Sequence, residues 1–221
     1  INELNQRFLN FLNEKNDLNI TSIDNFKIIT NNEIKIDINQ NKKIINFFQT
    51  SPKGRVVFEG KKIENWTVNF LGTDKFDKSN LISKLGNRLV TGCITFYKLS
   101  LNNINLNIEN SICEDGLNIV NSSGEINEIQ INNSFSDALD LDFSNIKINK
   151  LNVDYALNDC SDFSSGNYNI LEINLMRCGD KAVSVGEKSF FNLDYGKITQ
   201  SNYGIVTKDS SITTIEDIKI D

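Results

Sequence analysis

The chain has no histidine among its 221 residues, and its positive charge is low. Without histidine, His-based zinc sites, Ser-His-Asp triads and histidine general bases are excluded. The 23 Lys and Arg residues stand against 29 Asp and Glu residues, which gives a net charge of −6. Because nucleic acids and anionic membranes are bound by dense basic surfaces, this balance argues against both as partners. No stretch approaches the roughly 18 apolar residues of a membrane helix, so no membrane span is expected.

Cysteine is scarce, and the N-terminal residues contain neither a starting Met nor a targeting signal. The cysteines Cys93, Cys113, Cys160 and Cys178 form no CxxC pair. We therefore interpret them as small buried hydrophobic residues rather than as disulfides or metal ligands. The chain starts without Met and without a signal-like segment, so we expect a mature chain or an excised fragment.

A repeat of 22 residues runs through the second half of the chain. One column of small residues shows it without a gap: Gly116, Ala138, Cys160, Ala182 and Gly204. Upstream, the row that begins at Cys93 fits the repeat if its coil is one residue longer. A constant period of this length is typical of a solenoid, in which each repeat stacks on its neighbours.

Each repeat contains two runs with the two-residue alternation of a half-buried strand. In one row Leu139, Leu141 and Phe143 point one way, and Ala138, Asp140 and Asp142 point the other. A second apolar run follows after a polar turn. That turn has its own column, which we expect to form hydrogen bonds along the stack: Ser123, Asn145, Asn167, Ser189 and Ser211. The pattern predicts an all-β parallel β-helix rather than a leucine-rich repeat.

The repeat also divides the chain. We expect residues 51–221 to form the parallel β-helix, with residues 74–88 looped out. Residues 1–50 are predicted to form an N-terminal cap, made of a helix over residues 2–14 and short strands, because a solenoid end needs covering. The last coil starts at Ile212 and is incomplete, so we expect further domains or subunits at this open edge.

The repeat register brings acidic residues together. Asp140 stacks on Asp162 with Asp142 beside them, and Asp137 stacks on Asp159 at the turn before that strand. Stacked side chains lie about 4.8 Å apart, the spacing of neighbouring strands. Carboxylates this close cannot all ionise cheaply, so the register predicts either a shared proton or a bound cation.

A shared proton pairs an acid with a base, as glycoside hydrolysis requires. We predict Asp140, Asp142 and Asp162 as catalytic residues, with Asp140 or Asp162 as the general acid and its neighbour as the base or nucleophile. The stacked spacing is near the ~5–5.5 Å of retaining enzymes, and the diagonal is nearer the ~6.5–9.5 Å of inverting ones. A Ca²⁺ site is the alternative, and no other cofactor is expected.

Two simpler interpretations of these acids remain open. Asp115, Asp137 and Asp159 can form Asx turns, and the other acids can be solvated surface. Further residues around the acids are candidates for substrate binding, with ion-paired surface or half-buried packing as their alternatives. They are Asp137, Asp159, Asp180, Lys181, Glu187, Lys208 and Tyr155.

The rows DALDLDFSN, NDCSDFSSGN and CGDKAVSVGEKS resemble the right-handed parallel β-helix repeats of the pectate-lyase-like superfamily. The resemblance covers residues 92–221. It implies a right-handed coil, an extracellular or cell-surface location, and binding to or action on polysaccharides. The superfamily also contains non-enzymatic modules, so fold alone does not choose between functions.

Within that superfamily the acids are more informative than the fold. Polygalacturonase-like members combine clustered Asp with a Gly-His-Gly segment, which this chain lacks. The DxxD arrangement of tailspike-type hydrolases is more similar and matches Asp137/Asp140 and Asp159/Asp162. We therefore hypothesise a polysaccharide-binding or polysaccharide-hydrolysing β-helix. A lyase is a weaker alternative, because it would need a basic residue near the acids, and only Arg177, Lys181 and Lys208 qualify. The alternative is a non-catalytic structural or adhesive module of a larger surface protein, with the acids structural or Ca²⁺-binding.

Overall fold

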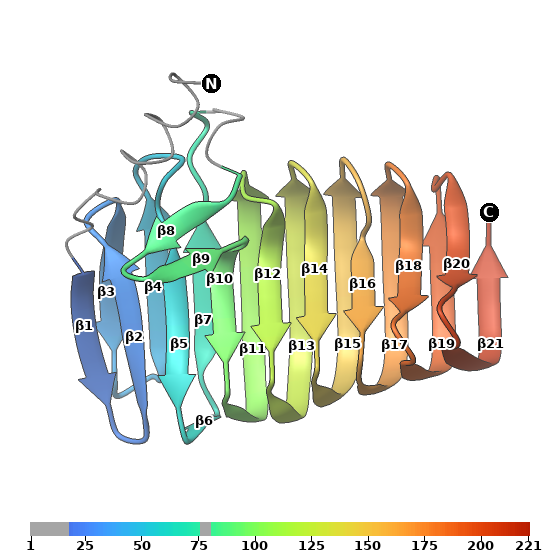
Figure 1. Cartoon of the computed structure of the whole chain (residues 1–221), viewed down its shortest axis with the longest axis horizontal. Coiled ribbons are helices and arrows are strands. Elements are labelled where there is room, and N and C mark those ends of the chain that lie inside the picture. Colours follow the sequence, from blue (N-terminus) through green and yellow to red (C-terminus); the bar gives the residue numbers. More distant parts are fainter. Residues whose placement is uncertain (1–17, 76–80) are drawn as a thin grey trace, which may run out of the picture.

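The computed structural model describes residues 18–75 and 81–221 as an all-β parallel solenoid. Two long sheets lie face to face, and each coil contributes one strand to each sheet (Figure 1). No residue in these two ranges is helical. The capping helix predicted over residues 2–14 lies outside the described residues. No helix of the described residues is long and apolar enough to cross a membrane.

Sheet A has nine strands, and its parallel part carries the short strand of each coil. In spatial order they are β1 (Leu18–Ile23), β2 (Phe26–Asn31), β5 (Val56–Gly60), β10 (Gly92–Tyr97), β12 (Asp115–Val120), β14 (Asp137–Asp142), β16 (Ser161–Ser164), β18 (Lys181–Gly186) and β20 (Tyr203–Thr207). The pairs from β5 onwards are parallel, whereas β1–β2 and β2–β5 are antiparallel.

Sheet B has ten strands and carries the long strand of each coil. In order they are β21 (Ile212–Ile220), β19 (Phe190–Thr199), β17 (Asn167–Cys178), β15 (Asn145–Ala156), β13 (Ser123–Ser134), β11 (Ser100–Ser111), β7 (Thr67–Leu71), β4 (Ile44–Gln49) and β3 (Ile34–Asn39), with β6 (Lys62–Glu64) beside β11. Only the β3–β4 pair is antiparallel among these described pairs. β20 and β21 are the last strands of their sheets (Figure 1).

The observed register confirms the predicted coil length. Asp140 pairs with Asp162, which lies 22 residues later. Ile94 pairs with Leu117, so the coil that begins near Cys93 is one residue longer, as expected. The division at residue 50 stays a prediction, although the antiparallel strands do gather at this end of the solenoid.

Alternation along the strands builds the core between the two sheets. Leu139 and Leu141 are fully buried there, and Asp140 and Asp142 face outward, as predicted. The predicted orientations of two residues in the same row, Phe143 and Ala138, were wrong. Phe143 is 57% exposed, because the strand ends at Asp142 and residue 143 turns the chain, whereas Ala138 is buried at the opposite corner.

The corners of the coils use left-handed backbone conformations at equivalent positions. One corner has the residues Lys98, Asn121, Phe143, Ser165 and Glu187, and the other has Asn110, Asn133, Tyr155, Arg177 and Gln200, all with positive φ. Asn suits this conformation better than other non-glycine residues do. A single left-handed residue ends each strand and redirects the chain, so the corner repeats without glycine.

Polar side chains bind one coil to the next beside the first corner. The predicted column is confirmed at Asn167, whose Nδ2 donates to Asn145 Oδ1 at 2.7 Å. Ser189 and Ser211 were placed in that column wrongly, because Asn167 pairs with Phe190 and both serines therefore lie one position earlier. They continue a column of serines in which Ser144 Oγ accepts the Ser122 backbone N–H at 3.0 Å, and Ser211 Oγ accepts that of Ser189 at 3.1 Å.

The four cysteines form two disulfides, so our interpretation of them as free hydrophobic residues was wrong. Cys93 is bonded to Cys113 and Cys160 to Cys178, with sequence separations of 20 and 18. These separations fall just short of one coil, and the chain therefore returns to bring the Cα atoms to 5.4 and 5.3 Å. Disulfides with these separations do not depend on a closely spaced pair such as CxxC, so the absence of that motif was not evidence against them.

The predicted loop over residues 74–88 is partly a hairpin of β8 (Ser83–Leu85) and β9 (Arg88–Val90). It lies over the outward face of sheet A near β5 and β10 (Figure 1). Leu85 and Val90 pack there against Ile29, Val57 and Tyr97 in a small second core. The hairpin thus covers the first half of this face.

Candidate functional site

The outward face of sheet A carries two columns of side chains that cross several strands. The central column is Thr95, Asn118, Asp140, Asp162 and Ser184. The second is Tyr97, Val120, Asp142, Ser164 and Gly186. We call the part with Asp140, Asp142 and Asp162 the acidic face. The structure thus brings together the three residues predicted to be catalytic.

Asp140 is the centre of the acidic face. Burial raises the pKa of its carboxyl to about 9, and the negative charges of Asp115 and Asp142 act in the same direction. Asn118 Nδ2 donates to Asp140 Oδ2 at 2.9 Å and to Asp142 Oδ2 at 3.5 Å. Burial also raises the pKa of Asp142, although a hydrogen bond with Asp140 opposes the rise. At neutral pH Asp140 therefore holds a proton beside a second carboxyl group.

Asp162 lies beside Asp140 on the next strand and has a different environment. Burial raises its pKa, and the positive charge of Lys208 opposes the rise. Lys208 reaches toward it across Gly186, where its Cε lies 3.0 Å from the position of a Cβ atom, so a side chain at Gly186 would displace it. Asp162 Oδ1 is buried and has no hydrogen-bond partner among the described residues.

Asp137 and Asp159 have structural roles, but not as the Asx turns of the simpler interpretation. Asp137 Oδ1 accepts the backbone N–H of Asp159 at 2.8 Å, and Asp159 Oδ1 accepts that of Lys181 at 2.9 Å. They bond to the next coil rather than to their own turn. Burial raises the pKa of Asp137 to about 6. Asp115, the preceding member of the column, is buried, and burial raises its pKa to about 7.

The remaining predicted binding residues lie around or away from the acidic face. Lys181 forms ion pairs with Asp159 and Asp180, so these residues form an ion-paired surface. Glu187 accepts a hydrogen bond from Ser165 Oγ at 3.0 Å, and its charge raises the pKa of Asp142. Tyr155 is not part of the site.

Tyr155 ends the long strand β15, on the corner that leads back to sheet A. Its ring lies 5.8 Å from the Arg177 guanidinium carbon, and it lines a separate hollow with Phe135 and Leu157. Asp154, the residue before it, is ion-paired with Arg177. The side chain therefore contacts neighbours at this corner.

A groove that the sequence did not predict adjoins the acids. It has a volume of about 340 Å³ and runs between the β8–β9 hairpin and sheet A. Its lining includes Arg88, Leu89, Thr95, Tyr97 and Asn118. The Thr95 hydroxyl is buried there without a partner among the described residues, and the Arg88 guanidinium lies 5.7 Å from the Tyr97 ring centre. Asn118 joins this groove to Asp140.

The repeat register predicts only some of the residues that line this groove. Thr95 and Asn118 precede Asp140 in its column, whereas Arg88 and Leu89 come from the looped-out segment. In the described ranges, no cluster of three or more His, Cys, Asp and Glu side chains is arranged to hold a metal ion. The Ca²⁺ alternative therefore stays a prediction.

No protein-family model, curated protein sequence or solved structure matches this chain. The resemblance to pectate-lyase-like repeats is thus supported at the level of the parallel solenoid, and no relative assigns a function to the acidic face.

Proposed function

We propose that the acidic face binds and hydrolyses a polysaccharide, with Asp140 as the general acid. The observation that carries this proposal is the stacking of Asp140 on Asp162 with Asp142 beside them, a cluster in which burial raises the pKa of Asp140 to about 9. A general acid must hold its proton at the working pH, and burial among like charges is how proteins achieve this.

In the proposed reaction Asp140 protonates the glycosidic oxygen as the bond from the sugar carbon to that oxygen breaks. Asp162 is the nucleophile, because the nearby Lys208 favours its ionised form. Strand spacing sets the two carboxyl groups about 5 Å apart, the range of retaining enzymes. Water then hydrolyses the sugar–Asp162 ester, and Asp140 takes the proton from that water.

The groove beside the hairpin supplies the binding site for the rest of the chain. Tyr97 offers an aromatic surface, and Thr95 and Asn118 offer polar groups that sugar hydroxyls can bond. A polysaccharide that follows the central column passes from this groove directly to Asp140. The predicted residues Glu187 and Lys208 border the far side of the acids.

The proposal includes a right-handed coil of the pectate-lyase-like type and an extracellular or cell-surface location. The two disulfides support that location, because such bonds persist in oxidising compartments.

The first prediction tests catalysis with a panel of neutral and acidic polysaccharides. We expect reducing ends to be released by the native chain, and Asp140→Asn and Asp162→Asn each to lower the rate by at least about 100-fold. Asp217→Asn is the matched control, because it removes the same charge from an exposed position of sheet B and should leave the rate unchanged. Full activity in either acidic-face variant would contradict the assignment.

A non-catalytic structural or adhesive module is the second candidate. It is favoured by the bonds of Asp137 and Asp159, which serve the backbone of the next coil and need no ligand. If no polysaccharide in the panel is cleaved, and none protects the chain against thermal unfolding, this second function replaces the first.

A further inference from the structure

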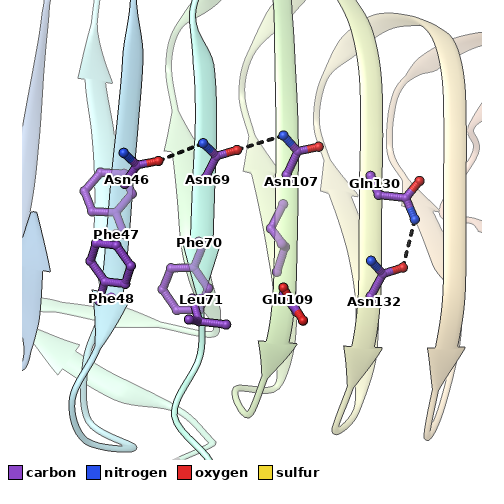
Figure 2. Close-up of a pocket in the computed structure, with 11 residues that line it drawn as sticks. Asn46, Phe47, Phe48, Asn69, Phe70, Leu71, Asn107, Glu109, Gln130 and Asn132 are labelled. Carbon is purple, nitrogen blue, oxygen red and sulfur yellow. Dashed lines mark hydrogen bonds between the residues drawn. The ribbon is translucent and has the colours of Figure 1, made fainter. Parts of the chain in front are cut away.

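A second groove lies on the outward face of sheet B, away from the acidic face. It has a volume of about 260 Å³ and spans β4, β7, β11 and β13. Figure 2 shows the side chains that line it: amides in one row, and Phe48, Leu71 and Glu109 in the next. We call it the amide groove.

A chain of amide hydrogen bonds crosses this groove. Asn46 Nδ2 donates to the Asp37 carboxylate at 3.1 Å, Asn69 Nδ2 to Asn46 Oδ1 at 2.8 Å, and Asn107 Nδ2 to Asn69 Oδ1 at 2.8 Å. Every bond has the same direction, so each amide polarises the next. The oxygen of Asn107, at the end of the chain, is consequently a strengthened acceptor.

The series of amide hydrogen bonds ends between Asn107 and Gln130, inside the groove (Figure 2). Gln130 occupies the next position of the row, but its amide turns along its own strand and donates to Asn132 Oδ1 at 2.8 Å. Asn107 Oδ1 therefore receives no bond from the following coil. The break leaves an acceptor that a ligand hydroxyl can use.

Apolar side chains flank this acceptor on one side. Phe48 is 43% exposed and Leu71 is 40% exposed, and the two are paired in the register. Glu109 follows Leu71 in the same row and adds a carboxylate. An apolar surface beside hydrogen-bond acceptors fits a sugar ring, which has an apolar face and a rim of hydroxyl donors. The carboxylate and the net charge of −6 disfavour an anionic ligand.

We infer that the amide groove is a binding site for a neutral oligosaccharide. The ring lies on Phe48 and Leu71, and its hydroxyls donate to Asn107 and Glu109. This site does not depend on the chemistry proposed for the acidic face, because it uses the other sheet and none of the same residues.

The experiment is an NMR titration of the full chain with neutral hexasaccharides built from glucose, xylose and N-acetylglucosamine. The side-chain amide signals of Asn107 and Gln130 are expected to shift with at least one of them. Asn107→Ala and Phe48→Ala should each weaken that binding by about tenfold or more. The titration is repeated in Asp140→Asn/Asp162→Asn, where the affinity should be unchanged, so failure of the acidic-face proposal is seen separately.

Two matched controls lie in the same sheet but outside the groove. Asn174 occupies the amide row further along, and Phe190 is an exposed aromatic residue of β19. Asn174→Ala and Phe190→Ala should leave the affinity unchanged. The inference is overturned if no hexasaccharide shifts these amides, or if Asn107→Ala binds as tightly as the native chain. Shifts that depend on protein concentration without sugar would overturn it as well, because they would show that a second copy fills the groove.

Discussion

At the scale of single residues, acids in the acidic face and beside it hold protons that the same groups in the unfolded chain have lost at the same pH. Burial raises the pKa of Asp137 to about 6, of Asp115 to about 7 and of Asp140 to about 9. All three start from an ordinary value of 3.8. Because the folded state binds these protons more tightly, they stabilise it at low pH, and this contribution is lost as pH rises through the folded pKa values.

The consequence is a melting temperature that falls as pH increases from about 5 to about 9. Asp140→Asn replaces the carboxyl by a neutral group of the same shape, so the variant should melt higher than the native chain at pH 9, by about 3 °C or more, and no higher at pH 4. Scanning calorimetry at the two pH values measures this. Asp217→Asn, at an exposed position, should show no such difference. Equal melting temperatures for Asp140→Asn and the native chain at pH 9 would mean that folding does not raise the pKa of Asp140.

The sequence predicted the acidic face because the repeat is constant at this point. A period of 22 residues places Asp140 on Asp162, and alternation places Asp142 beside them. Tyr155 was predicted to bind substrate because it borders the acidic coils in the sequence, but it lies at a corner after the long strand β15. Arg88 and Leu89 were missed, since they belong to the looped-out segment and reach the groove only through tertiary packing.

At the scale of the coil, a buried hydroxyl ties each short strand to its corner. Ser144 Oγ lies 2.7 Å from Asp142 O, and Ser189 Oγ lies 2.6 Å from Gly186 O. The coil between them has Gly166 in place of serine. In this coil the Tyr168 hydroxyl takes the place of the serine hydroxyl and donates to Ser164 O at 2.7 Å. An atom at Gly166 Cβ would lie 2.4 Å from that oxygen, so the glycine makes room for the tyrosine.

Tyr168→Phe is therefore expected to lower stability by about 1–3 kcal/mol, because buried carbonyl groups lose a donor while the ring volume stays nearly constant. Thermal unfolding followed by circular dichroism gives the value. Tyr195→Phe is the control, since Tyr195 is 44% exposed and should change stability by less than about 0.5 kcal/mol. Similar losses in the two variants would refute the structural role of the Tyr168 hydroxyl.

The coil architecture was predictable from the sequence, whereas its substitutions were not. The small-residue column and the alternation of Leu139 and Leu141 specify two strands per coil. They do not reveal that a tyrosine two residues away replaces a missing serine. Phe143 shows the same limit, because its apolar side chain predicted burial, whereas its place at a corner exposes it.

At the scale of the whole molecule, the coils contact mainly their sequence neighbours, so stability is the sum of similar interfaces. The disulfides lie within this stack in a particular way. Cys93–Cys113 and Cys160–Cys178 each close slightly less than one coil on itself, and neither fastens distant coils together. They constrain the path of the chain within a coil and leave the stacking of coils to hydrogen bonds and the core.

A solenoid built this way has a defined response to mechanical force. Pulled from its two ends, the chain should lengthen in steps of one coil, but the segments closed by the disulfides cannot extend. With separations of 20 and 18 residues, and about 3.4 Å per extended residue, the fully stretched oxidised chain should be about 120 Å shorter than the reduced one, after the distance that each disulfide itself spans is subtracted. Single-molecule extension with and without a reductant measures the difference. Equal lengths would show that neither disulfide limits the extension of the chain. A difference of half that size would show that only one of the two disulfides does.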